Sequence, residues 1–413
     1  MTYINFVGNL LIDTYIIIKK LGDGAYATVW LAYNIIHKQL VAVKIFEHKD
    51  TKHGLYELKL FDTFKNLKFK SFIKCLANFI YDDYYCLVLE LMDNSLYNFN
   101  YKKLTTDNII FILKQILEYL VELHKNNYIY CDLKPENILT FGLNYSDILK
   151  KILECHNKLL NNKQNKKKNN NKIVITELCK FINENIIDLN DSDESINSSE
   201  KSSDKYDNIN NSDYDNSLIT SDNSDSQSEK SYDSNISIDT NNYKNTIIKF
   251  GDIGSCKICN DTDNNTEKCV QTRYFICPEI ILHLNYNHKC DIWSLGCLLY
   301  ELITDSILYN PSNENINQEH LMLIIQSVGV IPKYMIDKSP IKDIYFTHDY
   351  KLKYKDVIIY DSIIKKLLNH RTRDTKYIYL IDLLMKMLII DPNKRISSDN
   401  ALKHPLFTKL IPT

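Results

Sequence analysis

The chain of 413 residues is longer than most single domains, and its 44% hydrophobic content excludes a wholly disordered protein. Its formal net charge of −2 does not indicate a protein that binds polyanions, and no apolar run approaches the ~18 residues of a membrane span. Eleven irregularly spaced cysteines, with no signal-like segment after Met1, lead us to expect an intracellular protein with free thiols, in the cytoplasm or the nucleus.

Strands are predicted first along the chain, and helices follow. β-branched runs bounded by turn residues predict strands at 15–21, 28–33, 40–46 and 85–91, and a helical patch is predicted at 56–64. Thr106 is expected to cap a helix whose apolar residues recur at spacings of three and four. Similar patterns predict helices at 291–304, 319–328 and 377–390. A β-rich part followed by a helical part is the α+β pattern of two unequal lobes.

The region 143–246 differs in composition from the rest. Residues 150–172 contain eight lysines and one glutamate, whereas residues 191–240 contain 13 acidic residues, three lysines and 15 serines. The second stretch has too few apolar residues to offset the entropy lost on folding, so we predict that it is disordered, while the pattern at 145–160 is compatible with a helix. The positive charge of 150–172 and the negative charge of 191–240 largely offset each other in the net charge of the whole chain.

A glycine-containing turn lies between the first two predicted strands. Two glycines there let backbone amides approach phosphate oxygens closely. The pattern alone also fits a plain hairpin turn, and an alanine stands at the place of a third glycine. A strand rather than a helix is predicted next, which argues against a dinucleotide-binding turn. The candidate phosphate-covering residues are Leu21, Gly22, Asp23, Gly24, Ala25, Tyr26, Ala27, Thr28 and Val29.

A lysine interrupts the apolar strand that follows this turn. Lys44 ends the run Val-Ala-Val-Lys, where a charged group is costly unless it meets an anion.

The most specific motif is Tyr130-Cys-Asp-Leu-Lys-Pro-Glu-Asn137. With this motif the chain resembles the eukaryotic Ser/Thr protein kinases, which implies a bilobal α+β fold, ATP and Mg²⁺ as cofactors, and protein substrates. The resemblance makes Asp132 the residue that orients the substrate hydroxyl and accepts its proton, and Lys134 the one that neutralises the transferring phosphate. It also implies that Lys44 pairs with Glu57, on the next predicted helix, and that the two position ATP.

The other motifs of the family follow in order. Asp252, in Phe-Gly-Asp-Ile-Gly, would bind Mg²⁺ together with Asn137, although 115 residues separate them where the family has about a dozen. Leu89, Glu90 and Leu91 correspond to the gatekeeper and the hinge that receives adenine. The resemblance also implies structural residues: Thr272 near Asp132, Asp291 bracing the catalytic loop, and a Glu279–Arg395 ion pair.

Within the family, the chain looks most similar to the SR-protein kinases. Gln271-Thr-Arg273, Tyr345-Phe-Thr-His348 and the long split of the domain carry this resemblance, which implies Arg/Ser-rich substrates. The sequence departs from the subfamily at Ile276, where an Arg is usual, and at Gln326, where the docking groove is usually acidic; Glu319 keeps one acid there.

We therefore expect an N-terminal tail (1–14), a kinase N-lobe (15–93) and a C-lobe in two parts (94–142 and 247–413), separated by a low-complexity spacer (143–246). We expect a monomer that contacts neither nucleic acid directly nor membranes. Two alternatives remain: a pseudokinase or scaffold, although Lys44, Asp132, Asn137 and Asp252 are all present, and a kinase with a different substrate class. Cys256 and Cys259 have metal-site spacing, but without a second ligand pair we interpret them as plain thiols.

Overall fold

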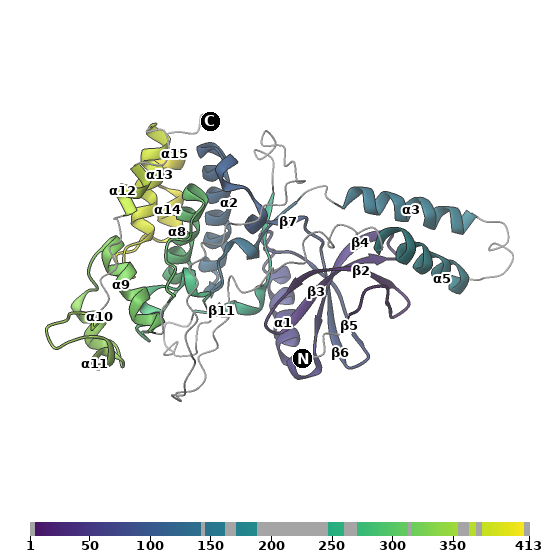
Figure 1. The fold of residues 1–413 in the computed structure, drawn as a ribbon, viewed down its shortest axis with the longest axis horizontal. Helices are drawn as coiled ribbons and strands as arrows, with labels where there is room; N and C mark the ends of the chain where they lie inside the picture. Colours follow the sequence, from purple (N-terminus) through teal and green to yellow (C-terminus); the bar gives the residue numbers. More distant parts are fainter. Residues whose placement is uncertain are drawn as a thin grey trace. The chain divides into compact units, whose positions relative to one another are not determined.

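The computed structural model describes residues 5–141, 145–161, 171–187, 247–259, 271–312, 315–353, 363–368 and 374–408. The chain forms two compact units, which are drawn in Figure 1. The described residues of the first unit fall within 5–94, 138–187 and 247–254, and those of the second within 95–137 and 255–408. The stretch 191–240, predicted to be disordered, lies outside the described residues. The predicted α+β fold, with a β-rich lobe and a helical lobe, is confirmed.

The first unit is built on a six-stranded antiparallel sheet with the strand order β1-β2-β3-β4-β6-β5. The strands are β1 (Leu10–Leu11), β2 (Tyr15–Asp23), β3 (Ala27–Asn34), β4 (Gln39–Phe46), β5 (Cys75–Tyr81) and β6 (Tyr84–Leu89). Helix α1 (Thr51–Asn66) packs against the sheet so closely that a Cβ on Gly54 would come within 2.5 Å of the Tyr85 ring. Only a residue without a side chain fits there. β9 (Ile138–Thr140) and β10 (Ile248–Phe250) pair antiparallel in the same unit, and β7 is Asn94–Ser95.

Part of the predicted spacer is folded. Helix α3 (Ser146–Asn161) agrees with the pattern at 145–160, but α5 (Asn171–Ile182) and the π-helical turn Asn183–Ile187 were not predicted. α3 and α5 pack side by side against the first unit's sheet (Figure 1). The expectation of a low-complexity spacer is wrong for α5. Its residues Val174, Leu178 and Ile182 recur every four positions and are buried.

The second unit is helical and is organised around α8 (Lys289–Thr304), in which every residue from Cys290 onward is buried. The N-cap of α2 (Thr106–Lys125) is Thr105 rather than Thr106, because the Thr105 hydroxyl accepts from the Asn108 amide in a reciprocal capping box. The remaining helices are α7 (Pro278–Ile281), α9 (Ile316–Val328), α10 (Lys333–Lys338), α11 (Lys342–Tyr345), α12 (Ile363–Leu368), α13 (Thr375–Met387), α14 (Ser398–Leu402) and α15 (Pro405–Thr408). β8 (Tyr128–Ile129) pairs with β11 (Lys257–Ile258). Among the described helices, none is both long and apolar enough to cross a bilayer.

Candidate active site

In the first unit, one lysine contacts two carboxylates. Lys44 Nζ lies 2.7 Å from Glu57 Oε2 and 3.0 Å from Asp252 Oδ1. β4 supplies the lysine, α1 supplies the glutamate, and the aspartate follows β10, so three separate elements converge here. The Lys44 and Glu57 side chains are almost fully buried, whereas the Asp252 side chain is 48% exposed. The Lys44–Glu57 pair inferred from the sequence is therefore present, and Asp252 joins it.

Burial and charge act in opposite directions on these groups. Burial alone would lower the pKa of Lys44, but the charges of Asp252 and Glu57 raise it above its ordinary value. Burial raises the pKa of Glu57, and the ammonium of Lys44 opposes that shift. Lys44 is thus held as a cation at the place where the sequence predicts contact with phosphate.

The predicted phosphate-covering residues form a hairpin between β2 and β3. Gly22 pairs with Val29, and the turn closes with a 2.9 Å hydrogen bond from the Gly24 amide to the Ala27 carbonyl. A strand follows the glycines, as predicted, which excludes a dinucleotide-binding turn. At the tip, the Tyr26 ring stacks on His53 of α1 with 4.0 Å between the ring centroids.

The hinge candidates end β6 and lie on the same sheet. The amide of Glu90 already donates to the Lys74 carbonyl at 2.8 Å, so this amide is not a donor for adenine. The Glu90 carboxylate pairs with Lys249 at 2.6 Å. Leu89 is buried. Leu91 is partly buried and packs on the apolar cluster that α3 and α5 form with β2 and β3.

In the second unit, the catalytic-loop residues form a connected network around Asp132. Thr272 Oγ1 donates to Asp132 Oδ1 at 2.7 Å, and Lys134 Nζ lies 2.9 Å from Asp132 Oδ2 and 3.0 Å from Thr272 Oγ1. Asn137 Nδ2 donates to Asp132 Oδ2 and to the Asp132 carbonyl, both at 2.9 Å. These contacts fix the orientation of the Asp132 carboxylate. The side-chain oxygen of Asn137, Oδ1, takes no part in them.

Asp291 braces this loop from the N-terminal end of α8. Its carboxylate accepts hydrogen bonds from the amides of Tyr130 (2.8 Å) and Cys131 (2.9 Å), and Cys131 has a left-handed backbone with φ 69°. His124 Nε2 lies 2.9 Å from the same carboxylate, and His124 Nδ1 lies 3.0 Å from Ser398 Oγ. His124 was missed from the sequence; its place at the end of an apolar helix gave no sign of this partner.

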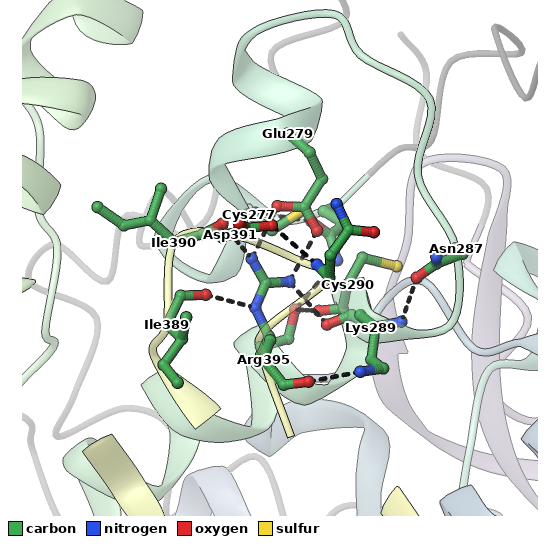
Figure 2. A network of polar contacts seen from close by, with 12 residues as sticks. Cys277, Glu279, Asn287, Lys289, Cys290, Ile389, Ile390, Asp391 and Arg395 are labelled. Carbon is green, nitrogen blue, oxygen red and sulfur yellow. Dashed lines mark hydrogen bonds and ion pairs between the residues drawn. The ribbon is translucent and has the colours of Figure 1, made fainter. Parts of the chain in front are cut away.

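A second buried network lies around Arg395 (Figure 2). Its guanidinium donates to both carboxylate oxygens of Glu279, at 2.7 and 2.8 Å, and to the carbonyls of Ile389, Ile390 and Lys289. The Lys289 ammonium in turn donates to the Arg395 carbonyl. Both side chains of the ion pair are at most 1% exposed, and burial, which would lower the pKa of Arg395, is outweighed by the charge of Glu279. Only a planar guanidinium can satisfy all these acceptors.

The structure thus gathers the predicted residues in two groups, one within each unit. Lys44, Glu57, Asp252 and the glycine hairpin belong to the first, whereas Asp132, Lys134, Asn137 and Thr272 belong to the second. Glu319, the acid expected in a docking groove, is buried and accepts from the Ser312 amide at 2.8 Å, so it provides no surface charge. Cys256 is buried and Cys259 is half-buried.

Comparison with known proteins identifies the family. A model of the protein kinase domain matches residues 15–146 and 233–407, so the chain belongs to the protein kinase family. It is 30% identical to the putative serine/threonine-protein kinase L205 of Acanthamoeba polyphaga mimivirus, over 96% of this chain and 88% of that protein. It is 25% identical to the serine/threonine-protein kinase AFC1 of Arabidopsis thaliana (98% and 73%) and 26% identical to the human dual specificity protein kinase CLK1 (98% and 68%). The chain is therefore an ATP-dependent serine/threonine protein kinase, and it acts on protein substrates.

The activation segment leads to one prediction. Many kinases use the Arg before the catalytic Asp to bind a phosphorylated activation segment, and Cys131 stands there instead. Alanine at Thr262 and at Thr266, which lie outside the described residues, should therefore leave kcat within about twofold of wild type, because less than about 0.5 kcal/mol of transition-state stabilisation would be lost. Steady-state kinetics after phosphatase treatment measures this. A large loss of activity in either variant would contradict it.

Proposed function

We propose that Asp132 orients the substrate hydroxyl and accepts its proton, and that Lys134 neutralises charge on the transferring phosphate. The Asp132–Lys134–Thr272 network carries this proposal, because it fixes a carboxylate and an ammonium side by side with a threonine of the activation segment between them. Positioning and electrostatic stabilisation are the main contributions a protein makes to phosphoryl transfer. The kinetic test with Asp132→Asn is given in the Discussion.

For the nucleotide, we assign Lys44 to the phosphates and the glycine hairpin to their cover. Asn137 and Asp252 are each proposed as Mg²⁺ ligands, as the family resemblance implies. Their chemistry fits the ion: Mg²⁺ prefers oxygen donors, Asp252 has a half-exposed carboxylate, and Asn137 uses its Nδ2 for Asp132, which leaves its Oδ1 to coordinate. Bound Mg²⁺ would neutralise charge developing on the phosphates.

We further propose that substrates carry arginine near the phosphorylated serine or threonine. Glu136, within the catalytic-loop motif, supports this, because both its carboxylate oxygens are buried without a hydrogen-bond partner in the described part of the chain. Burial raises the pKa of Glu136 to about 7; its own backbone amide and the charge of Lys134 oppose the shift, and the charges of Glu301 and Asp132 add to it. A buried carboxyl in this state gains most from a cationic partner, and a guanidinium would satisfy both oxygens. The finer resemblance to SR-protein kinases remains a prediction.

A peptide series tests this substrate preference. With wild-type enzyme, an Arg-Ser repeat should have a higher kcat/KM than acidic or proline-directed peptides. Glu136→Gln should raise KM for the repeat about tenfold or more, since a charged hydrogen bond contributes about 1.5–3 kcal/mol.

For a peptide without arginine, KM of the Glu136→Gln variant should match wild type. Equal kcat/KM for all three peptides would reject the arginine preference. A preference for the repeat that Glu136→Gln leaves unchanged would keep the substrate class but remove Glu136 as its determinant.

A further inference from the structure

The helical pair α3/α5 is an addition to the kinase sheet. Most of it lies between the two segments that match the family model, yet it belongs to the first compact unit. Ile152 of α3, Leu178 and Ile182 of α5, and Ile186 of the π-helical turn that follows α5 are at most 4% exposed. They form one cluster with four equally buried residues of the sheet, which come from β2 and β3: Ile16, Ile18, Leu31 and Tyr33. The pair therefore buries one end of a sheet face as completely as a core helix does.

Specific polar contacts fix the position of this pair. The Tyr33 hydroxyl lies 2.8 Å from His156 Nδ1, and both side chains are buried. At the margin, Lys38 Nζ donates to Asn157 Oδ1 at 2.9 Å, and Lys19 Nζ lies 5.2 Å from the centre of the Tyr145 ring. A buried hydroxyl that loses its partner is costly, so the Tyr33–His156 contact selects one placement of α3 on the sheet.

The same cluster reaches the nucleotide-binding residues. Leu21, the first residue of the glycine hairpin, and Leu91, at the end of the hinge, both pack against it. β2 carries Ile16 and Ile18 beneath the helices and continues directly into Leu21 and Gly22. Its pairing with β3 is irregular at two places in between, from Ile17 to Lys19 and from Lys20 to Gly22. Such irregularities weaken the ladder, so contacts from outside the sheet gain weight in positioning this strand.

We propose that the α3/α5 pair positions β2 and Leu91 for ATP, with Ile182 and Tyr33 as positioning residues. The proposal rests on the assignment of Leu21 and Leu91 to the nucleotide site. When the pair is loosened, a smaller fraction of molecules holds the glycine hairpin in its binding-competent place, and the apparent affinity for ATP falls by that fraction. Phosphate transfer from the molecules that do bind ATP is unaffected.

Full-length Ile182→Ala tests this. A loss of about four-fifths of the competent population would raise KM for ATP about fivefold, with kcat and KM for the protein substrate unchanged. The dissociation constant of a fluorescent ATP analogue, measured without phosphate transfer, should rise by the same factor. Ile182→Val should restore most of the affinity, and Tyr33→Phe, which removes only the buried hydroxyl, should shift KM in the same direction.

Two controls separate positioning from general destabilisation. Ile173→Ala makes the same change on α5 at a 43% exposed position and should behave as wild type. Leu11→Ala removes a fully buried side chain from the opposite cluster of the sheet, so it should lower the melting temperature without raising KM for ATP. If Ile182→Ala does not fold, Tyr33→Phe decides the question.

The proposal is overturned if Ile182→Ala and Tyr33→Phe leave the analogue affinity unchanged, or if Leu11→Ala weakens it equally. Failure of the underlying site assignment would look different, because Leu21→Ala and Leu91→Ala would then bind the analogue as tightly as wild type.

Discussion

Arg395→Lys should destabilise the protein by about 3–5 kcal/mol, the usual cost of breaking a buried ion pair. The buried Arg395 guanidinium donates to Glu279 and to three backbone carbonyls. The ammonium of a lysine, on a shorter side chain and without the planar fork, cannot satisfy these acceptors together. Glu279 would remain as a buried carboxylate with no bidentate partner. Thermal unfolding should show a melting temperature lower by about 10 °C.

A nearby lysine provides the control for this change. Lys394, next to Arg395, has a 77% exposed side chain and only a 3.9 Å contact with Asp391, so Lys394→Ala should melt within about 2 °C of wild type. The double variant Glu279→Leu/Arg395→Met removes both charges and should be less destabilised than Arg395→Lys alone. If Arg395→Lys melts like Lys394→Ala, the ion pair is not a main stabilising contact of the helical unit.

Asp132→Asn should lower kcat by about a hundred- to ten-thousand-fold, because a positioned general base typically contributes that much. Asparagine keeps the shape and can still accept the hydrogen bond from Thr272, but it cannot take a proton and leaves Lys134 without its charged neighbour. Affinity for ATP should change little, since Lys44, Glu57 and the glycine hairpin are untouched. Initial-rate kinetics gives kcat and KM, and a fluorescent ATP analogue gives the affinity separately.

Thr272 is the closest control for this prediction. Thr272→Ser keeps the hydroxyl that Asp132 accepts from and should retain most activity, whereas Thr272→Ala should lose part of it with unchanged ATP affinity. A near-normal kcat in Asp132→Asn would show that Asp132 is not the base, even if the protein is an active kinase.

Local motifs could indicate the candidate catalytic residues, because those residues lie in short runs of fixed spacing. Asp132, Lys134 and Asn137 are within six residues of one another, and their contacts follow from one tight loop. The Lys44–Glu57 and Glu279–Arg395 pairs came from the family resemblance, and the second joins residues 116 positions apart. No periodicity in the sequence would have indicated that pair.

The predictions that failed concern packing between distant segments. α5 was not expected because its apolar residues lie in an Asn- and Lys-rich region, and their partners on β2 and β3 are far away in the sequence, at residues 16–33. Glu319 was expected at a surface groove, yet helix α9 turns it inward to the Ser312 amide. His124 could not be assigned because Asp291, its partner, is 167 residues further along the chain.

The most direct measurement is transfer of the labelled γ-phosphate of ATP to a protein acceptor, by wild-type and Asp132→Asn enzyme in parallel, with identification of the modified amino acid. We expect the wild-type enzyme to label serine and threonine, and the variant to label them at least about a hundredfold more slowly. Equal labelling by the two enzymes, or none by wild type in the presence of Mg²⁺ with intact ATP binding, would contradict the assigned mechanism.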